Sequence, residues 1–241
     1  MARRRDRRKL LPMHEGENDD DRCLSAEVLA ALPLFPLPEV VFFPRVALPL
    51  HVFEPRYREM MDFALAHHGH IGVVLLKPGY EAQYHGRPPV HGVLTAGRLV
   101  KAERLADGRW NIVLRGVERV RIAEEHQGRS EAFRLARVES LPDLPSPVDR
   151  AAVETLRALV LEIARVVPEI GPPVASLFRR SSDPVRLCHE LASRLVADTH
   201  VQQALLEERD PSLRLERLVE VFAEIRLRLV GPTPGGGAPL H

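Results

Sequence analysis

The sequence predicts an α+β protein, in which a small, mainly antiparallel β-barrel with one inserted helix precedes a C-terminal helical bundle. Two changes of pattern along the chain support this. Short apolar runs, one with clear period-two alternation, fill residues 31–141 and are typical of half-buried strands. Apolar residues three and four positions apart fill residues 147–230 and are typical of amphipathic helices. The proline-rich residues 142–146 between them predict a linker.

Several short strands are expected in the first part. The apolar runs 34–37 and 46–53 contain or adjoin prolines, which confine such runs to sheet edges, bulges or strand starts. Residues 99–105 and 109–114 flank Asp107-Gly108, a dipeptide that predicts a hairpin with a type I′ turn. Gly116 then predicts a reversal into a further strand. The strands expected after it cover residues 117–122 and 133–138.

Helix starts are marked by proline in both parts. Pro55 predicts the first turn of the inserted helix, in which Tyr57, Met60, Met61 and Leu65 keep helical spacing. In the bundle, three pairs place a capping side chain before a proline and predict three helix starts: Ser146-Pro147, Asp183-Pro184 and Asp210-Pro211.

The chain ends are expected to lie outside the folded parts. Residues 1–30 begin with a basic block and continue with an acidic one, a pattern typical of a disordered arm. No apolar segment follows the arginines, so a secretory signal is not expected. Residues 231–241 are rich in glycine and proline and predict a flexible tail. An arm that contacts nucleic acid or anionic lipid is the alternative.

Composition excludes several classes of protein. The 241 residues carry 34 basic and 33 acidic side chains, so no general positive field favours nucleic acid. No apolar run approaches the roughly 20 residues of a membrane span. Cys23 and Cys188 lie far apart, which argues against a disulfide framework or a cysteine zinc site. A reducing compartment, the cytoplasm, is therefore expected.

No motif for catalysis is present. The sequence has no Gly-x-x-x-x-Gly-Lys-Ser/Thr loop for phosphates, no Gly-x-Gly-x-x-Gly and no Gly-x-Ser-x-Gly. The residues His67-His68-Gly69-His70 lack the spacing of a metal site and are interpreted as a polar helix end with Gly69 as its terminating residue. We therefore predict no enzyme activity, no catalytic residue, no cofactor and no metal.

Several segments resemble the amino-terminal domain of Lon-type ATP-dependent proteases. The resemblance is strong over residues 31–140 and looser in the helical part, and it includes the specific element Phe53-Glu54-Pro55-Arg56-Tyr57. Arg45 stands where glycine is common in that family, and Leu94-Thr95 stands where Val-Gly-Thr is common. The matching segments are Leu32–Leu37, Val41–Pro44, Leu48–Tyr57, Ile71–Leu76 and Asp107–Ile122.

The resemblance implies a PUA-like β-barrel followed by a helical bundle. It also implies a binding role, because ATP hydrolysis and peptide-bond cleavage belong to other domains of Lon-type proteases. We expect a stand-alone, non-catalytic module that binds unfolded or tagged polypeptide segments, with a proteolytic machine as a candidate partner. The apolar helix stripes could also pair between chains to form an oligomer.

Two sets of residues are candidates for the binding site or its support. Adjacent residues on a strand face opposite sides, so one of Phe42 and Phe43 could lie on an exposed apolar patch that holds polypeptide. The alternative, which we favour, is that both are buried. The motif residues 53–57 are interpreted as structural: Glu54 meets the helix dipole, Arg56 pairs with a nearby acid, and Tyr57 packs its ring and hydrogen-bonds its hydroxyl.

RNA binding through the PUA-like barrel is the alternative function. Aromatic residues make up only 5% of the chain, and no basic stripe interleaves with them as base stacking would need. Nucleic acid is therefore expected to bind, if at all, through the charged arm. A hydrolase with residues that no motif reveals is the third alternative.

Overall fold

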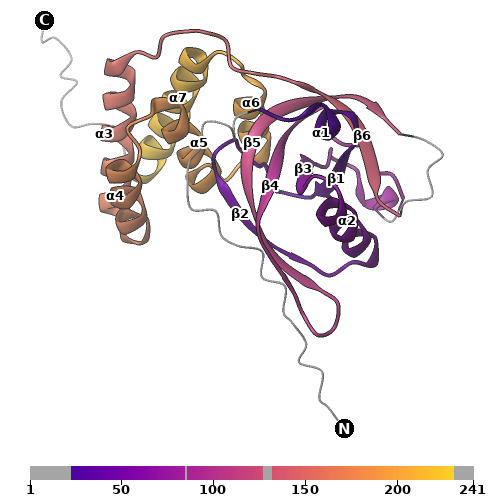
Figure 1. Ribbon diagram of the computed structural model, residues 1–241. Coiled ribbons are helices and arrows are strands. Elements are labelled where there is room, and N and C mark those ends of the chain that lie inside the picture. Colours follow the sequence, from indigo (N-terminus) through magenta and orange to yellow (C-terminus); the bar gives the residue numbers. More distant parts are fainter. Residues whose placement is uncertain (1–22, 85, 127–131, 231–241) are drawn as a thin grey trace, which may run out of the picture. The chain divides into compact units, whose positions relative to one another are not determined.

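The computed structural model describes residues 23–84, 86–126 and 132–230 (Figure 1), and the chain divides into two units between Pro142 and Asp143. The first unit carries the six strands that the described residues form. Its elements are α1 (Ala26–Ala30), β1 (Leu32–Leu37), β2 (Ala47–Val52), α2 (Pro55–Ala66), β3 (His70–Leu75), the 3-10 turn η2 (Glu81–Gln83), β4 (Val93–Arg104), β5 (Trp110–Glu125) and β6 (Arg134–Ser140).

The second unit is helical among its described residues, so the expected α+β class is confirmed. Its elements are α3 (Arg150–Val166), the 3-10 turn η3 (Pro168–Ile170), α4 (Gly171–Arg180), α5 (Pro184–Leu195), α6 (Thr199–Glu207) and α7 (Pro211–Val230).

The six strands form one sheet in the order β2-β5-β4-β3-β1-β6, and β5 pairs with β6 as well. Every pairing is antiparallel except that of β1 with β3. The pairing of β1 with β6 involves only residues 32–34 of β1, and the register of β5 with β6 shifts between Ile122 and Glu124. The sheet therefore rolls into a barrel that is not cleanly closed.

Prolines lie in this sheet where only one neighbouring strand is paired. Pro49 pairs with β5 from the terminal strand β2, Pro33 pairs only with β6, and Pro36 pairs only with β3. A proline has no N–H to donate, so a position that is paired on one side alone requires no hydrogen bond from it on the other side. The expected confinement to a sheet edge is confirmed for β2, the terminal strand, and is wrong for β1, which lies between β3 and β6.

The hairpin between β4 and β5 forms at Asp107-Gly108, but its turn is not of type I′. Only Gly108 has a positive φ, +84°, and its N–H donates to the carbonyl of Leu105 at 3.0 Å. A type I′ turn needs positive φ at both central residues, whereas a type I turn followed by a left-handed glycine needs it once. The prediction of the hairpin is confirmed, and that of its turn type is wrong.

Strand β5 continues through Gly116, so the predicted reversal there is wrong. A Cβ atom at this position would lie 2.3 Å from the carbonyl oxygen of Phe43. The absence of a side chain at Gly116 therefore allows the β1–β2 loop to approach β5 closely, and it does not mark a turn.

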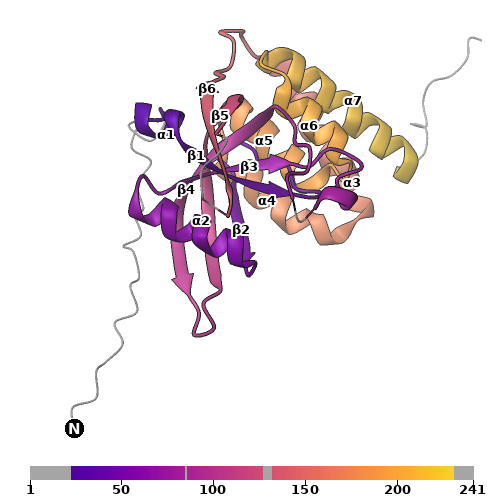
Figure 2. The same ribbon diagram turned by 90° about the vertical axis from the view of Figure 1, so that its right-hand side faces the viewer.

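Two apolar clusters fill the first unit. One lies between the sheet and α2, which crosses the strands in Figure 2, and it includes Met60 and Met61. The other includes Leu24 and Val28 from the start of the described chain. Ser25 caps α1 by accepting a hydrogen bond from the N–H of Val28. Residues 24–30 are therefore folded, which corrects their assignment to the charged arm; residues 1–22 and the tail 231–241 lie outside the described residues.

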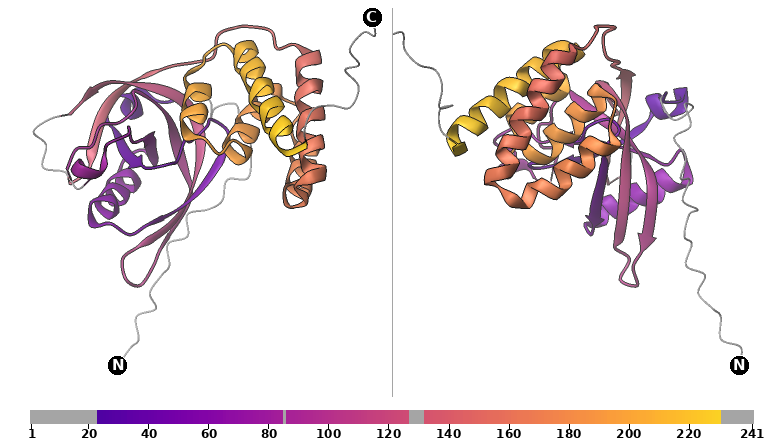
Figure 3. Two further views of the ribbon diagram at one scale, coloured as in Figure 1. Left: turned by 180° about the vertical axis from the view of Figure 1, so that it is seen from behind. Right: turned by 90° about the vertical axis from the view of Figure 1, so that its left-hand side faces the viewer.

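The helical unit buries the predicted stripes. Helices α3 and α7 pack side by side in both views of Figure 3, with Leu156 of α3 and Leu218 of α7 fully buried. Asp183 and Asp210 accept hydrogen bonds from the first N–H groups of α5 and α7, which confirms those helix starts. The start predicted at Ser146 is wrong, because Asp149 caps α3.

Helices α4 and α6 were not predicted, since neither begins with the pair of capping residue and proline that marks the other starts. No helix among the described residues has both the length and the apolar composition that spanning a membrane requires.

Candidate functional site

The motif residues lie at the start of α2, where Pro55 occupies the first helical position as expected. Glu54 is the capping residue, but its side chain makes no hydrogen bond to the helix backbone. Instead it accepts hydrogen bonds from Arg56 Nε and from the Tyr84 hydroxyl, each at 3.0 Å. The expected ion pair of Arg56 with a nearby acid is confirmed, and it ties the helix start to the residues after η2.

Arg56 is held from several directions. One terminal nitrogen donates to the carbonyl of Tyr84 at 3.1 Å, and the guanidinium lies over the rings of Tyr57 and Tyr84 at 4.6 and 5.3 Å from their centroids. With Nε and both terminal nitrogens engaged, this guanidinium is fixed in one orientation.

Tyr57 packs its ring into the core, as expected, and only 5% of its surface is exposed. The ring lies 4.5 Å from that of Phe35 between centroids. The expected hydrogen bond of its hydroxyl is absent among the described residues, which corrects that prediction. Burial raises the pKa of Tyr57 to about 12, so the hydroxyl keeps its proton and remains a hydrogen-bond donor near neutral pH.

A cavity of about 220 Å³ opens beside Tyr57. Among the described residues, its lining combines aromatic, proline and arginine side chains and contains no acidic residue. The lining residues are Pro36, Arg56, Tyr57, Gly86, Arg87, Pro88, Ala132, Phe133 and Arg134.

The three arginines of the lining are partly neutralised by two carboxylates outside it. Arg134 Nε donates to Glu125 at 2.9 Å, and another of its nitrogens donates to the carbonyl of Pro88 at 2.7 Å. Arg87 is half exposed and lies 3.7 Å from Glu125, while Glu54 neutralises Arg56. Counting the described residues alone, three guanidinium groups against two carboxylates leave one positive charge in excess at the cavity.

Phe42 and Phe43 do not form a surface patch. Both lie in the loop between β1 and β2, so strand alternation does not apply, and both rings are buried. Thr95 Oγ1 donates to the carbonyl of Phe42 at 2.6 Å, and a Cβ at Gly97 would lie 2.5 Å from the Phe42 ring. The hypothesis that one ring is exposed is wrong, and the favoured alternative is confirmed.

Phe53, in contrast, is 58% exposed, although it was interpreted as structural. Its ring stacks on His51 at 6.3 Å between centroids. Phe53 directly follows Val52, the buried last residue of β2, and extending the alternation of that strand by one residue predicts an outward side chain. This signal was missed.

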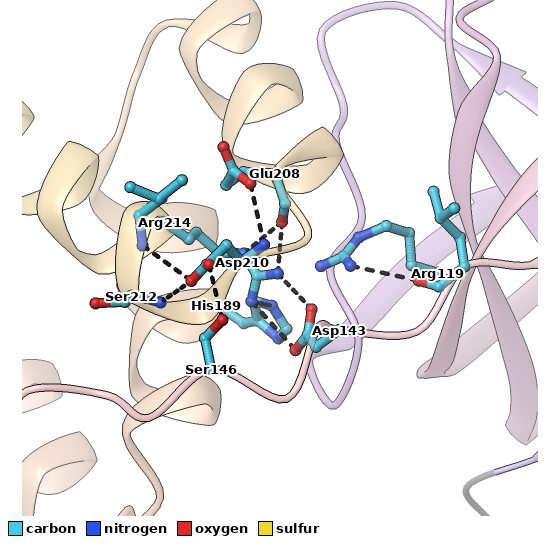
Figure 4. Close-up of polar contacts among 10 residues, drawn as sticks. Arg119, Asp143, Ser146, His189, Glu208, Asp210, Ser212 and Arg214 are labelled. Carbon is cyan, nitrogen blue, oxygen red and sulfur yellow. Dashed lines mark hydrogen bonds and ion pairs between the residues drawn. The ribbon is translucent and has the colours of Figure 1, made fainter.

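A second polar cluster lies in the helical unit and is saturated by its own contacts. Figure 4 shows Arg214 among Asp143, His189 and Glu208. The buried guanidinium pairs with the Asp143 carboxylate, donates from Nε to the carbonyl of Glu208 at 3.0 Å, and lies 3.1 Å from His189 Nε2. Each nitrogen of this guanidinium has a partner, and only 1% of the side chain is exposed, so the cluster holds the helical unit together and leaves no donor for a ligand.

The barrel with an inserted helix and the helical bundle that follows it define a PUA-like α+β fold. A family model described as the ATP-dependent protease La (LON) substrate-binding domain matches residues 31–224. The chain belongs to this family.

Curated relatives and solved structures agree with that assignment. The chain is 27% identical to Lon protease 1 of Myxococcus xanthus, over 84% of this chain and 25% of the relative, and 29% identical to the Lon protease of Trichlorobacter lovleyi, over 80% and 24%. It therefore spans about a quarter of the length of these relatives. The family model that matches this chain is that of the substrate-binding domain and not that of a catalytic domain.

The fold is similar to two solved amino-terminal domains. The N-terminal domain of a Mycobacterium avium complex Lon protease superposes with a TM-score of 0.62 at 20% identity, covering 80% of this chain and 98% of that one. A Lon N-terminal domain protein from Xanthomonas campestris gives 0.59 at 24% identity, covering 79% and 98%.

Proposed function

We propose that these residues form a non-catalytic module that binds unfolded or tagged polypeptide segments. The observation that carries this proposal is the match of a substrate-binding family model to residues 31–224. The 241 residues also contain no phosphate-binding loop, in keeping with a role in recognition and not in ATP hydrolysis. A proteolytic machine is the partner that such a module would serve.

The surface around the end of β2 and the start of α2 is the proposed contact region. Phe53 supplies an exposed aromatic ring, and Arg56, three residues later in the chain, is one of the residues that line the cavity. Consecutive Cα atoms are about 3.8 Å apart, so the Cα atoms of these two residues lie within about 11 Å. An extended polypeptide could therefore touch the ring and enter the cavity with a few adjacent residues.

Fluorescence anisotropy of the 241-residue chain tests this proposal. The probes are labelled, reduced and alkylated α-lactalbumin, which stays unfolded, and a labelled single-stranded RNA, each at two salt concentrations. Apolar recognition resists salt, whereas phosphate contacts weaken steeply with it. We expect salt-resistant binding of the polypeptide alone. Binding of RNA alone, or no binding of polypeptide at high micromolar concentration, would contradict the proposal.

A further inference from the structure

We propose that the cavity beside α2, lined by Tyr57, Arg56, Arg87 and Arg134, binds a carboxylate of the polypeptide. This inference rests on the proposed function and names the chemistry that the module recognises. The ligand is a carboxylate carried on an apolar stem, either the α-carboxylate at a chain end or the side chain of an acidic residue.

The hydroxyl of Tyr57 is the first support. Only 5% of the surface of Tyr57 is exposed, and its side chain lines the cavity. Within residues 23–84, 86–126 and 132–230 its hydroxyl has no hydrogen-bond partner. The hydroxyl oxygen is not one of the fully enclosed side-chain atoms that lack a partner, so it is accessible from the cavity. A hydroxyl that opens onto a cavity is placed to donate a hydrogen bond to a ligand that accepts one.

The charge of the lining is the second support. Three arginines belong to the lining that the structure describes, and no acidic residue does. Each nitrogen of Arg56 and Arg134 already has a partner in Glu54, Glu125 or a backbone carbonyl, so these two guanidinium groups are fixed and contribute positive charge to the lining. Arg87, whose side chain is 51% exposed with a 3.7 Å contact to Glu125, can turn toward a ligand at small cost. Guanidinium groups bind carboxylates through paired hydrogen bonds.

The size and walls of the cavity set how much of the polypeptide enters. A volume of about 220 Å³ is below the roughly 300–1,000 Å³ of sites for whole small molecules, so it suits one residue. Pro36, Pro88 and Phe133 supply apolar walls between the donors. One residue with an anionic group and an apolar stem satisfies both features of the lining.

Three labelled peptides of one unstructured sequence ending in leucine test the inference by anisotropy with the full chain. The first has a free α-carboxylate, the second a carboxamide end, and the third a carboxamide end with an internal Gln replaced by Glu. We expect the first or the third to bind about tenfold more tightly than the second, the effect of one charge-assisted hydrogen bond. The peptide that gains this advantage identifies the source of the carboxylate.

Two substitutions connect the preference to the cavity. Tyr57→Phe removes only the hydroxyl, and because that group has no partner among the described residues, the melting temperature should not fall. Arg87→Gln removes one charge of the lining. Each should reduce the preference for carboxylate at least threefold. Arg104→Gln is the matched control, since Arg104 is 60% exposed and 3.9 Å from Asp62, and it should keep the preference.

Equal affinity for all three peptides, or a preference that survives both cavity substitutions, would overturn the carboxylate site. In either case the peptides still bind, so the proposed function stands. If no peptide and no unfolded polypeptide binds, the proposed function itself fails, and the two failures are thus distinguishable.

Discussion

The hydroxyl of Tyr84 donates a hydrogen bond to Glu54 across thirty residues of sequence, at 3.0 Å. The same carboxylate accepts from Arg56 Nε with its other oxygen. Glu54 thereby joins the start of α2 to the residues after η2, which also line the cavity. The motif residues 53–57 therefore form the start of α2 and also brace the cavity wall, because Glu54 holds both Arg56 and Tyr84 in place.

Removing this brace should weaken the fold only modestly. Tyr84→Phe deletes one hydrogen bond to a partly exposed carboxylate, and we expect a loss of about 1 kcal/mol in the free energy of unfolding. Urea denaturation followed by circular dichroism measures it. Tyr80→Phe is the matched control, because Tyr80 lies four residues away and its hydroxyl makes no hydrogen bond with a described residue. Equal losses in both variants would contradict the bracing role.

Arg45→Gly should stabilise the first unit. Arg45 has a φ of +65°, a conformation that costs an ordinary residue about 1 kcal/mol and glycine almost nothing. We expect a gain of up to about 1 kcal/mol in the free energy of unfolding. Arg45→Ala removes the same side chain but keeps the backbone strain, so it should not stabilise. A gain in the alanine variant as large as in the glycine variant would assign the effect to the side chain.

Arg214→Ala should destabilise the helical unit strongly. Its guanidinium is buried and pairs with Asp143, so truncation leaves a partly buried carboxylate and a carbonyl without their donor. Breaking a buried ion pair costs about 3–5 kcal/mol. Thermal unfolding should therefore begin well below the wild-type temperature. Arg217→Ala, which breaks a pair 3.2 Å long on a half-exposed side chain, should cost less than about 1 kcal/mol; the reverse order would contradict the structural link.

Acid should weaken the attachment of α1 through His68. The N–H of His70 donates to Nδ1 of His68, so the neutral ring has its proton on Nε2 and donates it to the carbonyl of Ala31 at 3.1 Å. Burial lowers the pKa of His68 below its usual 6.5, and the carbonyl contact only partly offsets this. The folded state then binds its proton less readily than the unfolded state. The stability from this group is therefore present above about pH 6.5 and is lost as the pH falls.

His68→Gln tests that sign. The variant can keep a donor toward Ala31 but does not titrate, so the loss of unfolding free energy between pH 7.5 and 5.5 should be smaller than in the wild type. Urea titrations at these two pH values measure the difference. An identical loss in the two proteins would show that other groups cause the acid sensitivity.

The sequence predicted the fold class and most strands because period and proline placement are local signals. Pro55 and the two aspartate-proline pairs marked helix starts correctly, since a capping side chain acts within three residues. Helix α1 was missed because five residues carry too little periodicity, and its stability comes from Val28 packing against distant strands. The turn at Asp107-Gly108 was misassigned because one glycine satisfies two turn types.

The candidate site was only partly accessible to sequence reasoning. The motif 53–57 was found, but Phe42 and Phe43 were tested as exposed residues while Phe53 was overlooked. The burial of Phe42 depends on Gly97, 55 residues further along the chain, a long-range contact that no local pattern contains. The cavity brings Tyr57 next to Arg134, 77 positions away, so its chemistry appears only after folding.

The central claim is that the surface where β2 meets α2 binds unfolded polypeptide, and one pair of variants tests it most directly. Phe53→Ala removes the exposed ring of that surface, and Leu227→Ala removes a side chain of 54% exposure from α7 as the matched control. Anisotropy with labelled, reduced and alkylated α-lactalbumin compares them at one salt concentration. We predict that Phe53→Ala weakens binding at least fivefold while Leu227→Ala leaves it unchanged. Unchanged affinity in Phe53→Ala, with both variants folded, would contradict the claim.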